Sequence, residues 1–212
     1  MCGVTGADVV GAEILTEGSG WHEQLADRAE LQVSFTGRGR DRSAAVAELG
    51  SRVQAAAPAL TLPGLEVRHR RLNVHDEWRG RKVVGCRAGE TFVIRFLEVG
   101  ALERALVLLV AAEPTTVDGP SWHLSDPAAA RRVAQERAVT DARDRAEGYA
   151  AALGARLGPL RRLSEVGEPA APLAYRMAAR AEVAGDDVRE LGLEPEPVRV
   201  TVRCTTTWTL LA

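Results

Sequence analysis

The stretch that decides the fold runs from residue 125 to residue 158 and reads SDPAAARRVAQERAVTDARDRAEGYAAALGARLG. Six of its alanines recur at intervals of four residues: Ala130, Ala134, Ala138, Ala142, Ala146 and Ala150. Residues four apart are neighbours on a helix surface, so these methyl groups form one narrow ridge. Ser125 and Asp126 are helix-capping residues, and Pro127 suits the first helical position. We therefore predict one long alanine-rich helix over about 127–157, packed closely against another element through its ridge.

The chain before this helix alternates between strand and helix patterns. A first helix is expected between the possible caps Asp41 or Ser43 and the closing Pro58, and a second after Gly100. The two glycine-containing segments 17–21 and 76–82 are predicted as turns. Short apolar or alternating runs predict strands over 9–15, 28–36, 65–74, 83–97 and 115–124.

The chain after the long helix contains strand patterns alone. A strand is expected over 160–166, and two strongly alternating segments follow over 173–183 and 198–210, separated by an acidic loop. Hairpin connections imply antiparallel pairing. We therefore predict an α+β fold with a mainly antiparallel sheet and helices packed on one of its faces. We expect a single domain over 1–212, with a core over about 13–166 and a C-terminal strand pair over about 173–210.

Composition restricts the classes of function. The chain has 212 residues with 27 basic and 29 acidic side chains, a balance that is unlike a dedicated nucleic-acid binder. Its three cysteines fit neither a disulfide framework nor a zinc pattern. The longest apolar run, 105–112, is too short to span a bilayer. Residues 1–10 lack the basic and apolar regions of a signal peptide, so the default location is the cytoplasm. The strong preference for Arg over Lys is typical of a GC-rich, actinobacterial-like bacterial composition.

The motifs together resemble the SIMPL-domain family, also called YggE-like proteins. Its hallmark is the long helix with Ala134 to Ala150 in register, ending in Leu153-Gly154 and Leu157-Gly158. Gly37-Arg38-Gly39 after a strand, the stretch Val84 to Ala88, and the closing segment Val198 to Leu210 match in order. The resemblance covers most of the chain. It implies an α+β fold, homo-oligomerisation in some members, and an envelope or stress-related role without known catalytic residues. The chain departs from the family at Cys86, where an aromatic residue is common, and in its lack of a visible export signal.

No catalytic, cofactor-binding or metal-binding residue is predicted. His69 and His75 fall on one face of one strand but about 20 Å apart, too far to share an ion. Nothing in the sequence brings a histidine and an acid to Cys86, which therefore reads as a small buried residue, as does Cys204.

One arginine-rich cluster is a candidate surface for an anion or a partner. Its members lie in two segments of the chain: Arg38, Arg40, Arg42, Arg68, Arg70, Arg79 and Arg81. The alternative is a solvated strand face.

Two functional hypotheses follow. The first is a non-enzymatic SIMPL-like protein that acts by homo-oligomeric assembly or by binding a protein partner, since its long strands can pair across subunits. The second is an anion or nucleic-acid binding module that uses the arginine cluster, with nucleic acid the less favoured ligand at this net charge.

Overall fold

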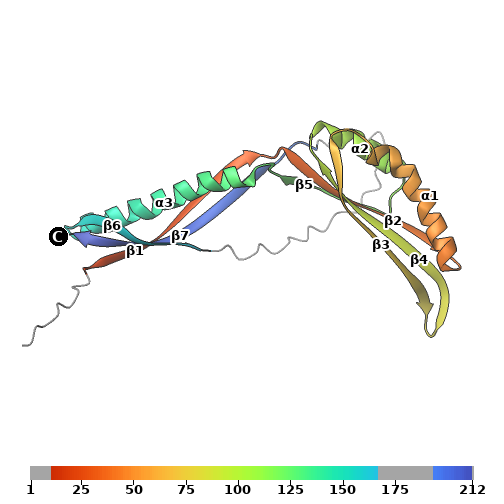
Figure 1. Cartoon of the computed structure of the whole chain (residues 1–212), viewed down its shortest axis with the longest axis horizontal. Coiled ribbons are helices and arrows are strands. Elements are labelled where there is room, and N and C mark those ends of the chain that lie inside the picture. Colours follow the sequence, from red (N-terminus) through yellow and green to blue (C-terminus); the bar gives the residue numbers. More distant parts are fainter. Residues whose placement is uncertain (1–10, 167–192, 212) are drawn as a thin grey trace, which may run out of the picture. The chain divides into compact units, whose positions relative to one another are not determined.

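The computed structural model describes residues 11–166 and 193–211, and the described chain forms two compact units (Figure 1). Of the described residues, unit 1 comprises 11–24, 126–166 and 199–211, and unit 2 comprises 25–125 and 193–198. The predicted α+β class is confirmed, but the strands form two separate sheets instead of one.

Unit 2 alternates strands and helices around a four-stranded antiparallel sheet with the order β3-β4-β2-β5. The succession strand-helix-strand-strand-helix-strand with this order is the split βαβ arrangement of ferredoxin-like folds. Its elements are β2 (Arg28–Gly39), α1 (Arg42–Leu60), β3 (Leu65–Arg79), β4 (Lys82–Phe96), α2 (Gly100–Ala111) and β5 (Thr116–His123).

The core of unit 2 follows from alternation along its two central strands. Leu31 pairs with Ile94, and Val33 pairs with Phe92, so their buried side chains lie side by side on one face. Helices α1 and α2 both cover this face (Figure 1). No described helix of the unit covers the opposite face, which we call the uncovered face. Its central positions are polar or small: Gln32, Ser34 and Thr36 on β2, and Gly89, Thr91 and Val93 on β4.

Unit 1 places one long helix, α3 (Pro127–Ala152), along a three-stranded sheet. The strands are β1 (Glu13–Leu25), β7 (Pro197–Leu211) and β6 (Arg156–Val166), in that spatial order. Asp126 caps the helix by accepting from the Ala129 N–H at 2.9 Å, as the sequence predicts. The helix ends earlier than the predicted residue 157, because Gly154 adopts a positive φ of 68° that terminates it.

The alanine ridge faces the sheet, as predicted. All six alanines of the four-residue series are buried. A Cβ at Gly20 would lie 2.2 Å from the Ala134 carbonyl oxygen, and one at Gly18 would lie 2.0 Å from that of Ala138. The helix backbone therefore rests almost directly on β1, and only glycine on the strand opposite alanine on the helix permits this distance.

A buried hydrogen-bond chain fixes the same contact. The Thr16 hydroxyl donates to the Ala142 carbonyl at 2.8 Å and lies 3.0 Å from the Thr206 hydroxyl. Trp208 Nε1 donates to Thr206 Oγ1 at 2.9 Å. Since the Thr16 hydroxyl donates its proton to Ala142, the Thr206 hydroxyl is the donor in the hydroxyl pair, and it also lies 3.4 Å from the Thr16 carbonyl oxygen, a second acceptor. This series of hydrogen bonds therefore runs from β7 through β1 to the backbone of α3.

Several predicted boundaries are wrong. The expected turn over 17–21 lies inside β1, because its glycines serve the helix contact instead of a turn. The expected connection over 76–82 is shorter, since β3 continues to Arg79 and β4 begins at Lys82. The strand over 198–210 is confirmed as β7. The expected strand over 173–183 lies outside the described residues.

Candidate functional site

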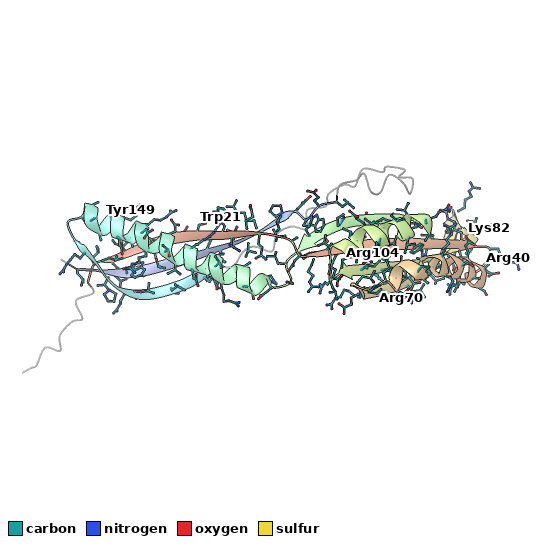
Figure 2. All side chains as sticks on the ribbon, turned by 90° about the horizontal axis from the view of Figure 1, so that it is seen from above. Trp21, Arg40, Arg70, Lys82, Arg104 and Tyr149 are labelled. Atoms are coloured by element: carbon teal, nitrogen blue, oxygen red, sulfur yellow. The ribbon has the colours of Figure 1, made fainter. Side chains whose placement is uncertain are left out.

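The seven arginines of the predicted cluster all belong to unit 2, and strand pairing divides them among three places. Two lie on the face covered by the helices, two lie at the uncovered face, and three lie at or near the β3–β4 turn. Figure 2 labels Arg70, Arg40 and the neighbouring Lys82. The structure therefore does not join the seven into one patch, and their role as a site stays a prediction.

On the helix side, Arg42 at the start of α1 binds Asp76 of β3 with two hydrogen bonds of 3.2 Å. The Cys86 thiol also donates to Asp76, at 3.2 Å. The Arg42 guanidinium, followed by the thiol, holds the pKa of Asp76 below its ordinary value. Burial, followed by the nearby Asp76 carboxylate, raises the pKa of Cys86. Cys86 therefore remains a protonated thiol at neutral pH, which is the wrong form for a nucleophile.

Arg70 also lies on the helix side. It pairs with the buried carboxylate of Glu90, and its guanidinium lies 5.2 Å from the centre of the Phe92 ring. Both partners belong to β4. The Arg70 charge is therefore paired within the fold, although the side chain itself is 61% exposed.

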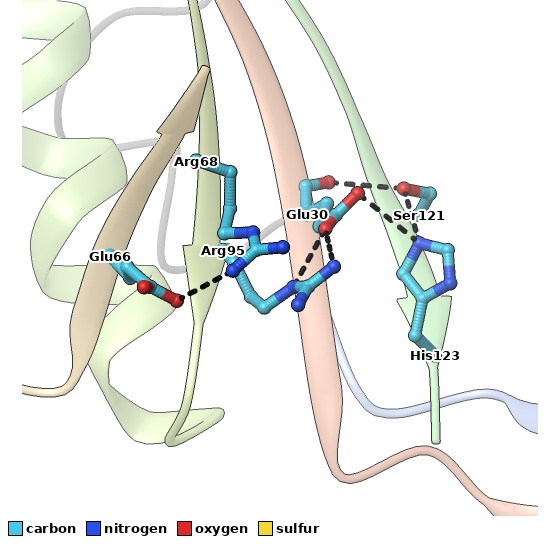
Figure 3. Close-up of polar contacts among 6 residues, drawn as sticks. All are labelled: Glu30, Glu66, Arg68, Arg95, Ser121 and His123. Atoms are coloured by element: carbon cyan, nitrogen blue, oxygen red, sulfur yellow. Dashed lines mark hydrogen bonds and ion pairs between the residues drawn. The ribbon is translucent and has the colours of Figure 1, made fainter. Parts of the chain in front are cut away.

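The uncovered face carries basic and acidic side chains that form ion pairs with each other. Arg38 lies 3.7 Å from Glu77, and Arg68 lies 3.5 Å from Glu66. Next to the second pair, Figure 3 shows a network that the sequence did not reveal. In it, the Glu30 carboxylate pairs with Arg95 at 2.6 Å and lies 3.8 Å from His123, and the Ser121 hydroxyl donates to the Glu30 carbonyl oxygen. The alternating charges of this face resemble an ordinary solvated sheet.

The uncovered face also lacks the groups that stack on bases. Sheets of this topology that bind single-stranded RNA carry aromatic side chains on their two central strands. The central positions of β2 and β4 on this face are glutamine, serine, threonine, glycine and valine, as given above. Base stacking on this sheet is therefore not supported by its described residues.

The β3–β4 turn is an exposed basic segment. We call residues 78–84 the hairpin end. Trp78 pairs with Val83, and Arg79 pairs with Lys82, across the turn formed by Gly80 and Arg81. Arg79, Arg81 and Lys82 form no ion pair within residues 11–166 and 193–211. Arg40 lies at the start of the neighbouring α1 and pairs with Asp41 at 3.4 Å. Of the predicted cluster, Arg79 and Arg81 are therefore the members without an ion pair among the described residues.

Unit 1 exposes an apolar edge that the sequence reasoning missed. Among the described strands, β6 is hydrogen-bonded on one side only, to β7. Its Leu160, Leu163 and Val166 are 42%, 48% and 45% exposed. The sequence predicts a strand over 160–166, but only the spatial order of the sheet reveals that this strand is an edge.

The described residues hold no other obvious chemical centre. Within 11–166 and 193–211, no three His, Cys, Asp or Glu side chains are grouped so that they could hold a metal ion. None of the helices in the described ranges has both the length and the apolar character needed to cross a bilayer.

A protein-family model described as "SIMPL: Protein of unknown function (DUF541)" matches residues 14–208, a range that includes parts of both units. The chain belongs to the SIMPL family. The resemblance carried by the alanine ladder and the closing strand is thereby confirmed. A comparison with curated proteins finds no match. Since the family description names no activity, the function of this SIMPL protein has to be argued from its surfaces.

Proposed function

We propose that this SIMPL protein is non-enzymatic and acts through homo-oligomeric assembly, with β6 as the strand at which two copies meet. The observation that carries the proposal is the exposed apolar edge of unit 1. A long edge strand presents unpaired N–H and C=O groups that can pair with another strand. The first half of β6 is irregular, with register shifts between Leu157 and Arg162, so residues 162–166 are the regular part of this edge. The alternative to a second copy is a different protein that adds an extended strand to this edge.

The sequence of β6 is complementary to itself in an antiparallel register centred on Leu163. In that register Leu163 faces Leu163 of the second copy, while Arg161 faces Glu165 and Arg162 faces Ser164. Apolar and opposite-charge pairs across strands each contribute about 0.2–1 kcal/mol. Such pairing uses one surface twice around a twofold axis, which is the commonest form of protein association. Within one copy Glu165 already pairs with Arg131 of α3, and Arg161 lies 3.8 Å from Glu13 of β1, so an Arg161–Glu165 contact between copies has to share these partners and adds less than the apolar pairing.

The test is the effect of Leu163→Lys on the mass in solution, measured by light scattering over a wide concentration range. The substitution places two lysines opposite each other in the proposed register, so we expect the mass to fall from that of an oligomer to that of one chain. Val46→Lys on α1 is the matched control, because Val46 is 43% exposed and lies in unit 2. A wild-type protein that is monomeric throughout would contradict the proposal, as would an oligomer unaffected by Leu163→Lys.

The second hypothesis, an anion or nucleic-acid module, receives less support. Five of its seven arginines, at positions 38, 40, 42, 68 and 70, already pair with carboxylates. Only Arg79 and Arg81 are left, and both lie in the hairpin end.

A further inference from the structure

The hairpin end combines exposed apolar side chains with free cations. Trp78 is 62% exposed, and Val83 and Val84 are 42% and 55% exposed. Large apolar side chains at an exposed turn are costly in water unless they contact something. Between them lie Arg79, Arg81 and Lys82, whose charges are not neutralised within the described residues.

Basic side chains also outnumber acidic ones around the hairpin end. Residues 38–42 and 76–87 hold seven arginine or lysine side chains against three acidic ones, whereas the whole chain carries a net charge of −2. Figure 2 shows Arg40 and Lys82 at the same end of the unit. The acidic groups Asp41, Asp76 and Glu77 are each paired with an arginine. Of the four excess charges, three therefore lie in the exposed turn, and the fourth, Arg87, lies on β4.

The geometry makes this turn a narrow projection. Strands β3 and β4 extend past α1 and close in a tight turn (Figure 1). Gly80 adopts a φ of 63°, and a Cβ there would meet nothing within 4 Å. Trp78 and Val83 are directly opposite each other, so they share one face of the hairpin, while Arg79 and Lys82 share the other.

We propose that the hairpin end binds the surface of an anionic lipid bilayer. This inference goes beyond the assembly proposed above and rests on unit 2 alone. Tryptophan settles at the boundary between headgroups and acyl chains, valines enter the apolar side of that boundary, and Arg and Lys pair with lipid phosphates. Nucleic acid fits the cations but leaves Val83 and Val84 exposed to water. An acidic protein surface also pairs with the cations, so it is an outcome of the test.

The experiment measures co-sedimentation of the full chain with two kinds of vesicle, pure phosphatidylcholine and equal parts of phosphatidylcholine and phosphatidylglycerol. We expect binding to the anionic vesicles only, weakened by high salt. The triple variant Arg79→Gln, Arg81→Gln, Lys82→Gln should weaken this binding about a hundredfold, because each basic residue near such a surface contributes about a fivefold factor. The matched control is Arg52→Gln, Arg104→Gln, Arg132→Gln, which removes the same charge elsewhere and should change binding little.

A second variant separates insertion from simple charge attraction. Trp78→Ser leaves the charge unchanged, so it should weaken vesicle binding and remove the blue shift of tryptophan emission that vesicles induce. Circular dichroism should show that all variants remain folded, since every substituted side chain is exposed. Failure of the wild type to bind anionic vesicles would overturn the proposal, and so would full binding by the triple variant. Loss of single-stranded DNA or acidic-peptide binding in the triple variant, without any vesicle binding by the wild type, would also overturn it.

Discussion

At the residue scale, the distance between α3 and β1 is set by Gly18 and Gly20. An added Cβ at Gly20 would lie 2.3 Å from the Ala138 nitrogen as well as 2.2 Å from the Ala134 oxygen. Both are backbone atoms, so no side-chain rotation relieves the overlap, and the helix itself has to move. Unit 2 has a similar close approach between a strand glycine and a helix backbone, because a Cβ at Gly37 would lie 2.3 Å from the Leu49 nitrogen of α1.

Gly20→Ala should therefore reduce the free energy of unfolding by about 2 kcal/mol or more, in the upper part of the range for overpacked sites. Denaturant titration checks the value. Gly148→Ala is the control, because Gly148 lies in α3 with nothing within 4 Å of an added Cβ. There the same change should stabilise by about 0.5–1 kcal/mol through helix propensity. Equal effects of the two substitutions would refute the close approach.

Asp141 should make the folding stability of unit 1 depend on pH. Its carboxylate accepts from the Ser19 N–H of β1 at 2.9 Å and from Arg145 at 3.1 Å, and these contacts lower its pKa, the Ser19 amide most. A pKa lower in the folded state stabilises the fold above the unfolded value, near pH 4, and this contribution disappears as the pH falls through the folded value. Asp141→Asn should thus cost up to about 1 kcal/mol at pH 7, because solvent screens this partly exposed group, and the cost should shrink as the pH falls below 4. A pH-independent difference in the unfolding midpoints of the two proteins would count against this linkage.

At the element scale, the long helix could be predicted because its signal is local. A cap, a first-turn proline and a period of four residues all lie within one stretch of sequence. The turn expected over 17–21 was wrong because glycine marks both turns and close backbone approaches, and sequence alone does not separate the two. The identity of β6 as an edge depends on strand order, which is a property of the whole sheet.

The arginine cluster shows the same limit. Arg68 and Arg70 have the same parity in the sequence, so a regular strand would place them on one face. A bulge between Val67 and His69 breaks the alternation of β3. As a result Arg68 pairs with Glu66 (Figure 3), while Arg70 reaches the buried Glu90 on the other side. The sequence shows which arginines are present, but it does not show which of them lie together in the folded protein.

Ala142→Leu tests the packing of α3 as an element. Ala142 is fully buried, and its Cβ would lie 2.6 Å from a Cβ at Gly18. A leucine there should overpack the contact and cost about 1–3 kcal/mol of unfolding free energy. Thermal unfolding of the variant beside Ala151→Leu, on the exposed side of the same helix, separates overpacking from any change in helix propensity. A neutral result at Ala142 would mean that the ridge faces water.

At the scale of the whole molecule, the two units carry different surfaces. Unit 1 presents the apolar β6 edge, and unit 2 presents the basic hairpin end. Among the described residues, the interior side chains of unit 2 pack as an apolar core, and the buried hydroxyls of unit 1 bind one another and the helix backbone. Neither set forms a catalytic arrangement. We therefore propose that assembly through the β6 edge of unit 1 underlies the function of this SIMPL protein.

Hydrogen exchange of the β6 backbone amides, followed as protein concentration rises, tests this claim most directly. In a single copy, half of the β6 amides point away from β7 and exchange quickly. If two copies pair through β6, these amides become protected at high concentration, while those of β3, an edge strand of the other sheet, keep their exchange rates. Protection of β6 that stays constant from dilute to concentrated solution, together with the mass of one chain, would contradict this claim.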